Sequence, residues 1–177
     1  MPAGSSVMAT EEIGSEPLSA TSEAVELAAI RQVQALYNIA GDRLRLAELA
    51  ATFTEDGVLE TATDRMVGRA AIAEGLDPSR KAAQSGGVRR PTLVRHNLTT
   101  SSIALTGQAS AAGRSYFIVF TDIGPDHMGV YVDKLTKTGD GWRLAHRRVF
   151  IDWLSPESLF PELAAPYRTR VAARGGA

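Results

Sequence analysis

The 177-residue sequence predicts one α+β domain, in which three helices are followed by a long, curved antiparallel sheet. Two observations predict this class. Apolar residues recur at helical spacing after residue 22, and from residue 92 onward four strand-like stretches are separated by tight, glycine-containing turns. A sheet that twists around three helices is expected to form a cone with a pocket at its open end.

The expected domain spans residues 23–153. We expect the tail over 1–22 to be disordered, because it is rich in Ser, Ala, Gly, Thr and Glu and shows no sustained helical or strand period. The C-terminal extension over 154–177 contains Pro156, Pro161 and Pro166, which are too closely spaced for one helix. It is expected to pack on the domain as short turns.

The first helix is predicted to begin near Ser22, whose hydroxyl can cap it, and to end near Gly41. Its apolar stripe is formed by Ile30, Val33, Tyr37 and Ala40. A second short helix is predicted with Leu46, Leu49, Ala50 and Phe53 on one side. A third begins at Gly68 and extends toward Leu76 or Arg80.

Between the second and third helices, Glu55-Asp56-Gly57 is typical of a turn, and two short strands are predicted over 58–61 and 66–67. Residues 85–91 are predicted to be a mobile connection. The long strands are predicted over 92–105, 113–122, 129–138 and 142–153, with turns at Gly107, at Gly124-Pro125-Asp126 and at Gly139-Asp140-Gly141. Their short connections predict an antiparallel meander.

The composition excludes several function classes. Lys and Arg (19) nearly balance Asp and Glu (20), which argues against general nucleic-acid binding. The absence of cysteine removes disulfides, thiolate metal sites and cysteine nucleophiles. The three histidines have no close metal-ligand spacing, so we expect no metal and no cofactor. No signal peptide or membrane span is predicted, and we expect a cytoplasmic protein.

Three stretches carry a resemblance to a known family: IRQVQALYNIAGDRLRLAELAATFTEDGVLET, VGRAAI and GVYVDKLTKTGDGWRLAHRRVFIDW. In this order they resemble the SnoaL-like branch of the nuclear transport factor 2-like superfamily, whose fold is a cystatin-like α+β cone. The resemblance covers nearly all of residues 23–153. It implies the cone and its pocket, but not one function, because the members include dehydratases, isomerases, cyclases and non-catalytic binders.

The resemblance also pairs Asp42 with His96. In the dehydratase and dehydrochlorinase members, an aspartate of the first helix orients a histidine on the first long strand. A carboxylate bound to one ring nitrogen fixes the tautomer, so that the other nitrogen can move a proton. The alternative interpretation is structural: Asp42 then serves in a turn at the helix end, and His96 bonds to the backbone.

Four further residues are candidates for substrate binding. Tyr37 stands where the dehydrochlorinase-like members carry a basic residue and other members a tyrosine, and it either donates to a substrate oxygen or is a core aromatic. Arg147 matches a pocket arginine of some relatives, or lies on the surface. Arg147 and Arg148 should point to opposite faces of their strand. Asp133 is a strand carboxylate that can serve as a base or pair with a neighbouring arginine. His127 either contacts the ligand or lies exposed in a loop. His146 alternates with Trp142 and Leu144 and is expected to be a packed or an interface residue.

Together these residues suggest an acid–base enzyme of the dehydratase, isomerase or cyclase type, which acts on a small hydrophobic metabolite without a cofactor. The alternative is a non-catalytic module of the same fold that binds a ligand or dimerises. We also considered the small subunit of a ring-hydroxylating oxygenase. The expected partners are a small hydrophobic ligand and further copies of the chain, as a homodimer or homotrimer.

Overall fold

The computed structural model describes residues 19–79 and 91–164. The tail up to residue 18, most of the connection predicted over 85–91, and the end of the chain from residue 165 lie outside the described residues. The first helix, α1, spans Ala20–Asp42 and begins after Ser19, whose Oγ accepts a hydrogen bond from the N–H of Ser22 at 3.2 Å. The helix therefore begins two residues before Ser22, where it was predicted to begin, and the expected domain boundary at residue 23 stays a prediction.

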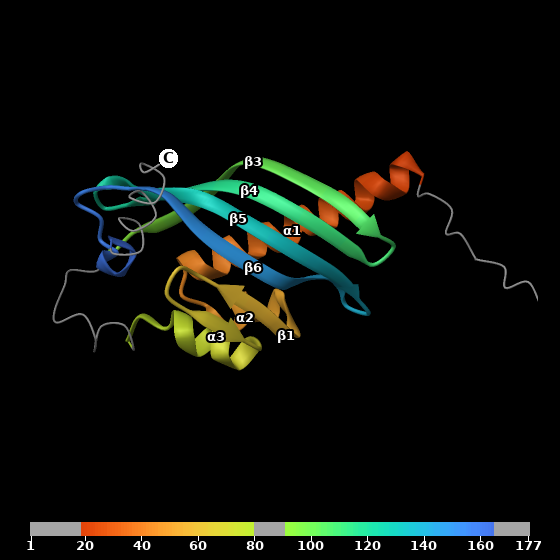
Figure 1. Cartoon of the computed structure of the whole chain (residues 1–177), viewed down its shortest axis with the longest axis horizontal. Coiled ribbons are helices and arrows are strands. Elements are labelled where there is room, and N and C mark those ends of the chain that lie inside the picture. Colours follow the sequence, from red (N-terminus) through yellow and green to blue (C-terminus); the bar gives the residue numbers. More distant parts are fainter. Residues whose placement is uncertain (1–18, 80–90, 165–177) are drawn as a thin grey trace, which may run out of the picture.

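Helix α1 lies along the concave face of the four long strands, as Figure 1 shows. The buried side of this helix contains the predicted apolar stripe and two amides: Ile30, Val33, Gln34, Tyr37, Asn38 and Ala40. The end of α1 packs closely against the next helix at Gly41. A Cβ added to Gly41 would lie 3.2 Å from Cδ1 of Leu49. The last residue of α1, Asp42, thereby faces the first long strand.

The middle elements are α2 (Leu46–Ala51), β1 (Phe53–Glu60), β2 (Arg65–Val67) and α3 (Arg69–Leu76). Two expectations here were wrong. Phe53 begins β1 instead of continuing the second helix, and Glu55-Asp56-Gly57 lies inside β1 at an irregularity in its pairing. The chain bulges so tightly that a Cβ at Gly57 would come within 2.8 Å of the Cβ of Phe53.

The long strands are β3 (Val94–Gly107), β4 (Ser110–Thr121), β5 (Gly124–Thr138) and β6 (Gly141–Leu154). They form the predicted antiparallel meander within a sheet of order β2-β1-β6-β5-β4-β3. One pairing differs from the wholly antiparallel sheet that was expected, because β1 runs parallel to β6. On β4, alternate side chains from Ala111 to Thr121 are buried, so the concave face of the sheet forms the core.

Bulges in β5 and β6 change which side chains face that core. The turn between β4 and β5 closes at Gly124, which has a φ of 89°, so the Gly-Pro-Asp segment begins a strand instead of forming the predicted loop. In β5, Asp126 is the extra residue between the pairs Phe120–Pro125 and Val119–His127. In β6 the extra residues are Ala145, opposite Lys134 and Leu135, and Asp152, opposite Met128 and Gly129.

The convex face of the sheet exposes several large apolar side chains, namely Tyr116, Phe120, Met128 and Trp153. The expected dimer or trimer stays a prediction. Within 19–79 and 91–164, no helix combines the length and the hydrophobicity needed to cross a bilayer.

Candidate active site

Asp42 and His96 form the contact that the resemblance implied. The Nδ1 atom of His96 lies 2.7 Å from Oδ1 of Asp42, and the backbone N–H of His96 donates to the same carboxylate at 3.1 and 3.2 Å. Because an ionised carboxylate only accepts hydrogen bonds, Nδ1 carries the proton and Nε2 of the neutral ring keeps a lone pair. Asp42 therefore bonds to β3 and does not serve as a turn former at the helix end.

A second pair of the same kind, which the sequence did not predict, joins His127 to its neighbour Asp126. The Nδ1 atom of His127 lies 2.8 Å from Oδ1 of Asp126, and both side chains are buried. The bulge in β5 makes this possible, because it turns two successive side chains away from solvent. The expectation of an exposed loop histidine was wrong.

The surroundings of the second pair change the pKa values of both Asp126 and His127. Burial on its own would raise the pKa of Asp126, but hydrogen bonds from His127, Leu159 and Ser158 outweigh it and lower that pKa. Burial lowers the pKa of His127, although the hydrogen bond and charge of Asp126 oppose the change. His127 is thus held neutral near pH 7, with its Nε2 lone pair available.

Both histidine rings line one cavity of about 240 Å³ between α1, the sheet and the C-terminal segment. We call it the inner cavity. The ring centroids of His96 and His127 are 6.5 Å apart. The other walls are largely apolar and aromatic, and include Leu44, Leu49, Leu59, Val94, Phe117, Tyr131, Ile151 and Phe160. Among the described residues, neither Nε2 atom has a hydrogen-bond partner, so both are available to a molecule in the cavity.

Tyr37 also lines the inner cavity, as predicted, and Tyr131 lies beside it. Burial raises the pKa of Tyr37 and raises that of Tyr131 well above its ordinary value, against the opposing charge of Arg147. Both phenols consequently stay protonated and can donate hydrogen bonds. Asn38 completes the polar part of this wall, and its Oδ1 is buried without a partner among the described residues.

Arg147 and Asp133 do not line the inner cavity. Their side chains are buried and form a bidentate pair, with Nε and Nη2 of Arg147 each 2.8 Å from a carboxylate oxygen. The guanidinium carbon lies 4.2 Å from the ring centroids of both Tyr37 and Tyr131. The structure therefore places this pair behind the two tyrosines, where it supports the cavity wall, and bears out the interpretation that Asp133 pairs with an arginine.

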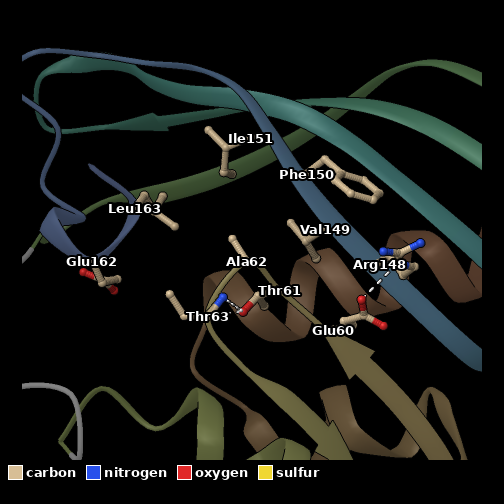
Figure 2. Close-up of a pocket in the computed structure, with 10 residues that line it drawn as sticks. All are labelled: Glu60, Thr61, Ala62, Thr63, Arg148, Val149, Phe150, Ile151, Glu162 and Leu163. Carbon is tan, nitrogen blue, oxygen red and sulfur yellow. Dashed lines mark hydrogen bonds and ion pairs between the residues drawn. The ribbon is translucent and has the colours of Figure 1, made fainter. Parts of the chain in front are cut away.

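A neighbouring outer cavity of about 340 Å³ lies between β6, the β1–β2 turn and the 3₁₀ helix η1 (Pro161–Leu163), as Figure 2 shows. Val149, Ile151 and Leu163 line both cavities. At one end, Glu60 pairs with Nε of Arg148 at 3.1 Å, as Figure 2 shows. The other carboxylate oxygen of Glu60 lies 3.1 Å from Nε2 of His146. The expected alternation of His146 with Trp142 and Leu144 is broken, because the bulge at Ala145 moves His146 to the other face.

No group of three His, Asp or Glu residues suited to a metal ion occurs among residues 19–79 and 91–164. The chemistry that the described site offers directly is proton transfer. Its histidines are held in one tautomer by carboxylates, and neutral phenols lie beside them.

The burial of His127 predicts how stability depends on pH. Because its pKa in the folded chain is lowered, the unfolded chain binds more protons as the pH falls through the ordinary value of about 6.5. We expect the free energy of unfolding to decrease between about pH 7 and pH 5, and to decrease less in His127→Gln, as measured by urea unfolding at each pH. Parallel curves for the two proteins would contradict this assignment.

Comparison with known proteins agrees with this fold. The model for the SnoaL-like domain matches residues 22–148. A protein of unknown function from Mycobacterium tuberculosis is 26% identical, with a TM-score of 0.65 over 84% of this chain and 92% of that one. None of the curated proteins that were compared matches the chain.

Two further solved structures are similar. A protein from Catenulispora acidiphila, solved in complex with S-DNPA, is 29% identical, with a TM-score of 0.62 over 73% of this chain and 95% of that one. A candidate scytalone dehydratase from Novosphingobium aromaticivorans is 22% identical, with a TM-score of 0.65 over 77% of this chain and 91% of that one. The last likeness concerns the fold alone.

Proposed function

Because the chain belongs to the family of SnoaL-like domains, we propose that it is an enzyme that transfers protons on a small apolar molecule in the inner cavity. One observation carries the proposal: two histidines, each fixed by a carboxylate at Nδ1, present their other nitrogen to one largely apolar space. A cavity that only had to bind an apolar molecule would not need two oriented proton acceptors.

In the proposed reaction, Nε2 of His96 removes a proton from a carbon atom of the substrate. Asp42 stabilises the imidazolium that forms, because its carboxylate accepts a hydrogen bond from Nδ1–H of His96, with the two atoms 2.7 Å apart. For a dehydration, the electron pair of the broken C–H bond forms the new double bond. The C–O bond then breaks, and the hydroxyl takes the proton from His96 and leaves as water.

His127 and the tyrosines have positioning roles in this proposal. Neutral His127 accepts a hydrogen bond from a substrate hydroxyl at Nε2, because its Nδ1–H is donated to Asp126. Tyr37 and Tyr131, which burial keeps protonated, donate to an oxygen that gains negative charge. An isomerisation would use the same groups, with the proton returned to a different carbon.

The proposal can be tested with 5-nitrobenzisoxazole, a flat bicyclic compound that opens to 2-cyano-4-nitrophenolate when a base removes the proton from its carbon 3. The intact chain should open this probe with saturation kinetics, and the double variant His96→Ala/His127→Ala should be no faster than buffer. Binding of the probe without turnover would overturn the proposal and favour the non-catalytic module.

A further inference from the structure

Residues 155–163, here called the closing segment, cover one end of the inner cavity. Phe160, Glu162 and Leu163 of this segment line that cavity, and Glu162 and Leu163 also line the outer cavity, as Figure 2 shows. The ring of Phe160 meets the ring of His127 edge to face, with their centroids 5.1 Å apart. The closing segment therefore covers one end of the cavity and helps to bury His127.

Three hydrogen bonds fasten the closing segment to the sheet, and each of them ends on Asp126. The N–H of Ser155 donates to the backbone oxygen of Asp126 at 2.8 Å. The hydroxyl of Ser158 donates to Oδ1 at 2.7 Å, and the N–H of Leu159 donates to Oδ2 at 2.9 Å. The carboxylate that orients His127 is thus also the anchor of the segment that covers it.

One oxygen of Asp126, Oδ1, binds both His127 and the closing segment. This oxygen accepts both the Nδ1–H of His127 and the hydroxyl of Ser158, while Oδ2 accepts from Leu159 and, at 3.3 Å, from Thr121. A fully buried carboxylate is costly unless its lone pairs are satisfied, and two of these four donors come from the closing segment. If the segment leaves, Asp126 must be hydrated, and water then reaches the ring of His127.

We propose that Asp126 is a positioning residue that couples the closing segment to His127, so that the segment closes over the cavity and the histidine becomes a neutral, oriented base in one step. The coupling rests on the proposed function only for its use in catalysis, because the contacts themselves involve no substrate. This coupling explains why a carboxylate, Asp126, stands at the bulge of β5. A molecule that draws the segment closed would also prepare the second histidine.

The charged groups around His127 agree with this direction of coupling. Asp126 on β5 and Glu162 on η1 favour its charged form, whereas His96 on β3 and burial disfavour it, and burial has the largest influence on its pKa. Opening the segment removes that burial together with Glu162. Burial lowers the pKa of His127 by more than Glu162 raises it, so that losing both raises the pKa. The open form should therefore bind a proton at His127 more readily.

Two serines of the closing segment provide a matched pair of variants. The hydroxyl of Ser158 accepts the N–H of Phe160 at 3.1 Å, and the hydroxyl of Ser155 accepts the N–H of Glu157 at 3.2 Å. Only the hydroxyl of Ser158 also reaches Asp126, since Ser155 is tied to it through its backbone. Ser158→Ala therefore removes the coupling bond, and Ser155→Ala controls for the loss of a serine hydroxyl.

The experiment measures two properties of the full chain without any ligand. In Ser158→Ala, the amide hydrogen of Leu159 should exchange about tenfold faster or more, since a hydrogen bond to a charged group is lost. The pKa of His127, followed by NMR of its ring, should rise toward the ordinary value. Ser155→Ala should leave both unchanged, and Ser158→Thr, which keeps the hydroxyl, should restore both.

Faster exchange at Leu159 with an unmoved His127 titration would overturn the coupling, and so would no change in either property. If Ser158→Ala does not fold, Phe160→Leu gives the second test, because it uncovers the ring and should shift the same titration. Failure of the catalytic proposal is a separate result. It would appear as absent turnover of 5-nitrobenzisoxazole by a chain in which exchange and titration still move together.

Discussion

Replacing Arg147 by methionine should lower the free energy of unfolding by about 3–5 kcal/mol. The substitution leaves the carboxylate of Asp133 fully buried, where the amide of Gln34 at 3.2 Å is its one remaining side-chain partner among the described residues. It also removes the guanidinium that lies between the rings of Tyr37 and Tyr131. Urea unfolding monitored by circular dichroism measures the difference directly.

The adjacent arginine is the matched control. Arg148 also pairs with a carboxylate, that of Glu60, but its side chain is 49% exposed. Arg148→Met should therefore cost about 1 kcal/mol or less. Equal losses for the two variants would mean that the Arg147 pair contributes no more than a surface ion pair, and would contradict the prediction.

A double variant separates the two causes of the loss. If the uncompensated charge of Asp133 dominates, then Arg147→Met/Asp133→Leu should be more stable than Arg147→Met alone, because apolar residues can replace a buried ion pair at little cost. If the packing of Tyr37 and Tyr131 on the guanidinium dominates, the second substitution should bring no recovery.

The sequence predicted the order of the elements well because that order depends on local patterns. The stripe from Ile30 to Ala40 and the glycine turns near 107 and 139–141 are short-range signals, and the structure confirms them. The resemblance also led correctly to the contact between Asp42 and His96, although these residues are 54 positions apart. Their catalytic role stays a prediction.

The errors at the candidate site share one physical origin, which is the strand bulge. Gly124-Pro125-Asp126 is typical of a turn, and no local pattern shows that the turn closes two residues earlier and leaves Asp126 as an extra residue. The same device at Ala145 reverses the alternation along β6, so that Arg147 lies on the buried face and His146 does not. The bulge, and not the local sequence, decides that the side chain of Asp126 is buried, and for this reason the sequence did not predict Asp126 as a site residue.

Replacing His96 by alanine should reduce kcat/KM for 5-nitrobenzisoxazole by about 10²–10⁴-fold, the usual contribution of a positioned base. The loss should fall mainly on kcat, since the base acts on the reacting proton and not on the bound molecule as a whole. The variant should still fold, because the backbone N–H of residue 96 continues to donate to Asp42.

His146→Ala is the control for this prediction. His146 also has a carboxylate partner, Glu60, but it does not line the inner cavity. Its removal should leave the turnover of the probe unchanged. A similar loss in both variants would indicate a general effect of removing a histidine, and undiminished turnover in His96→Ala would exclude His96 as the base.

Chemical rescue distinguishes a lost base from a distorted cavity. In His96→Ala the missing ring leaves space beside Asp42, and imidazole added to the solution can enter it and donate one N–H to the carboxylate. Its other nitrogen then stands where Nε2 stood, so part of the turnover should return. His96→Gln fills the same space with a side chain that cannot act as a base. It should be as slow as His96→Ala and should not respond to imidazole, whereas rescue of both variants would show that the added base acts from solution.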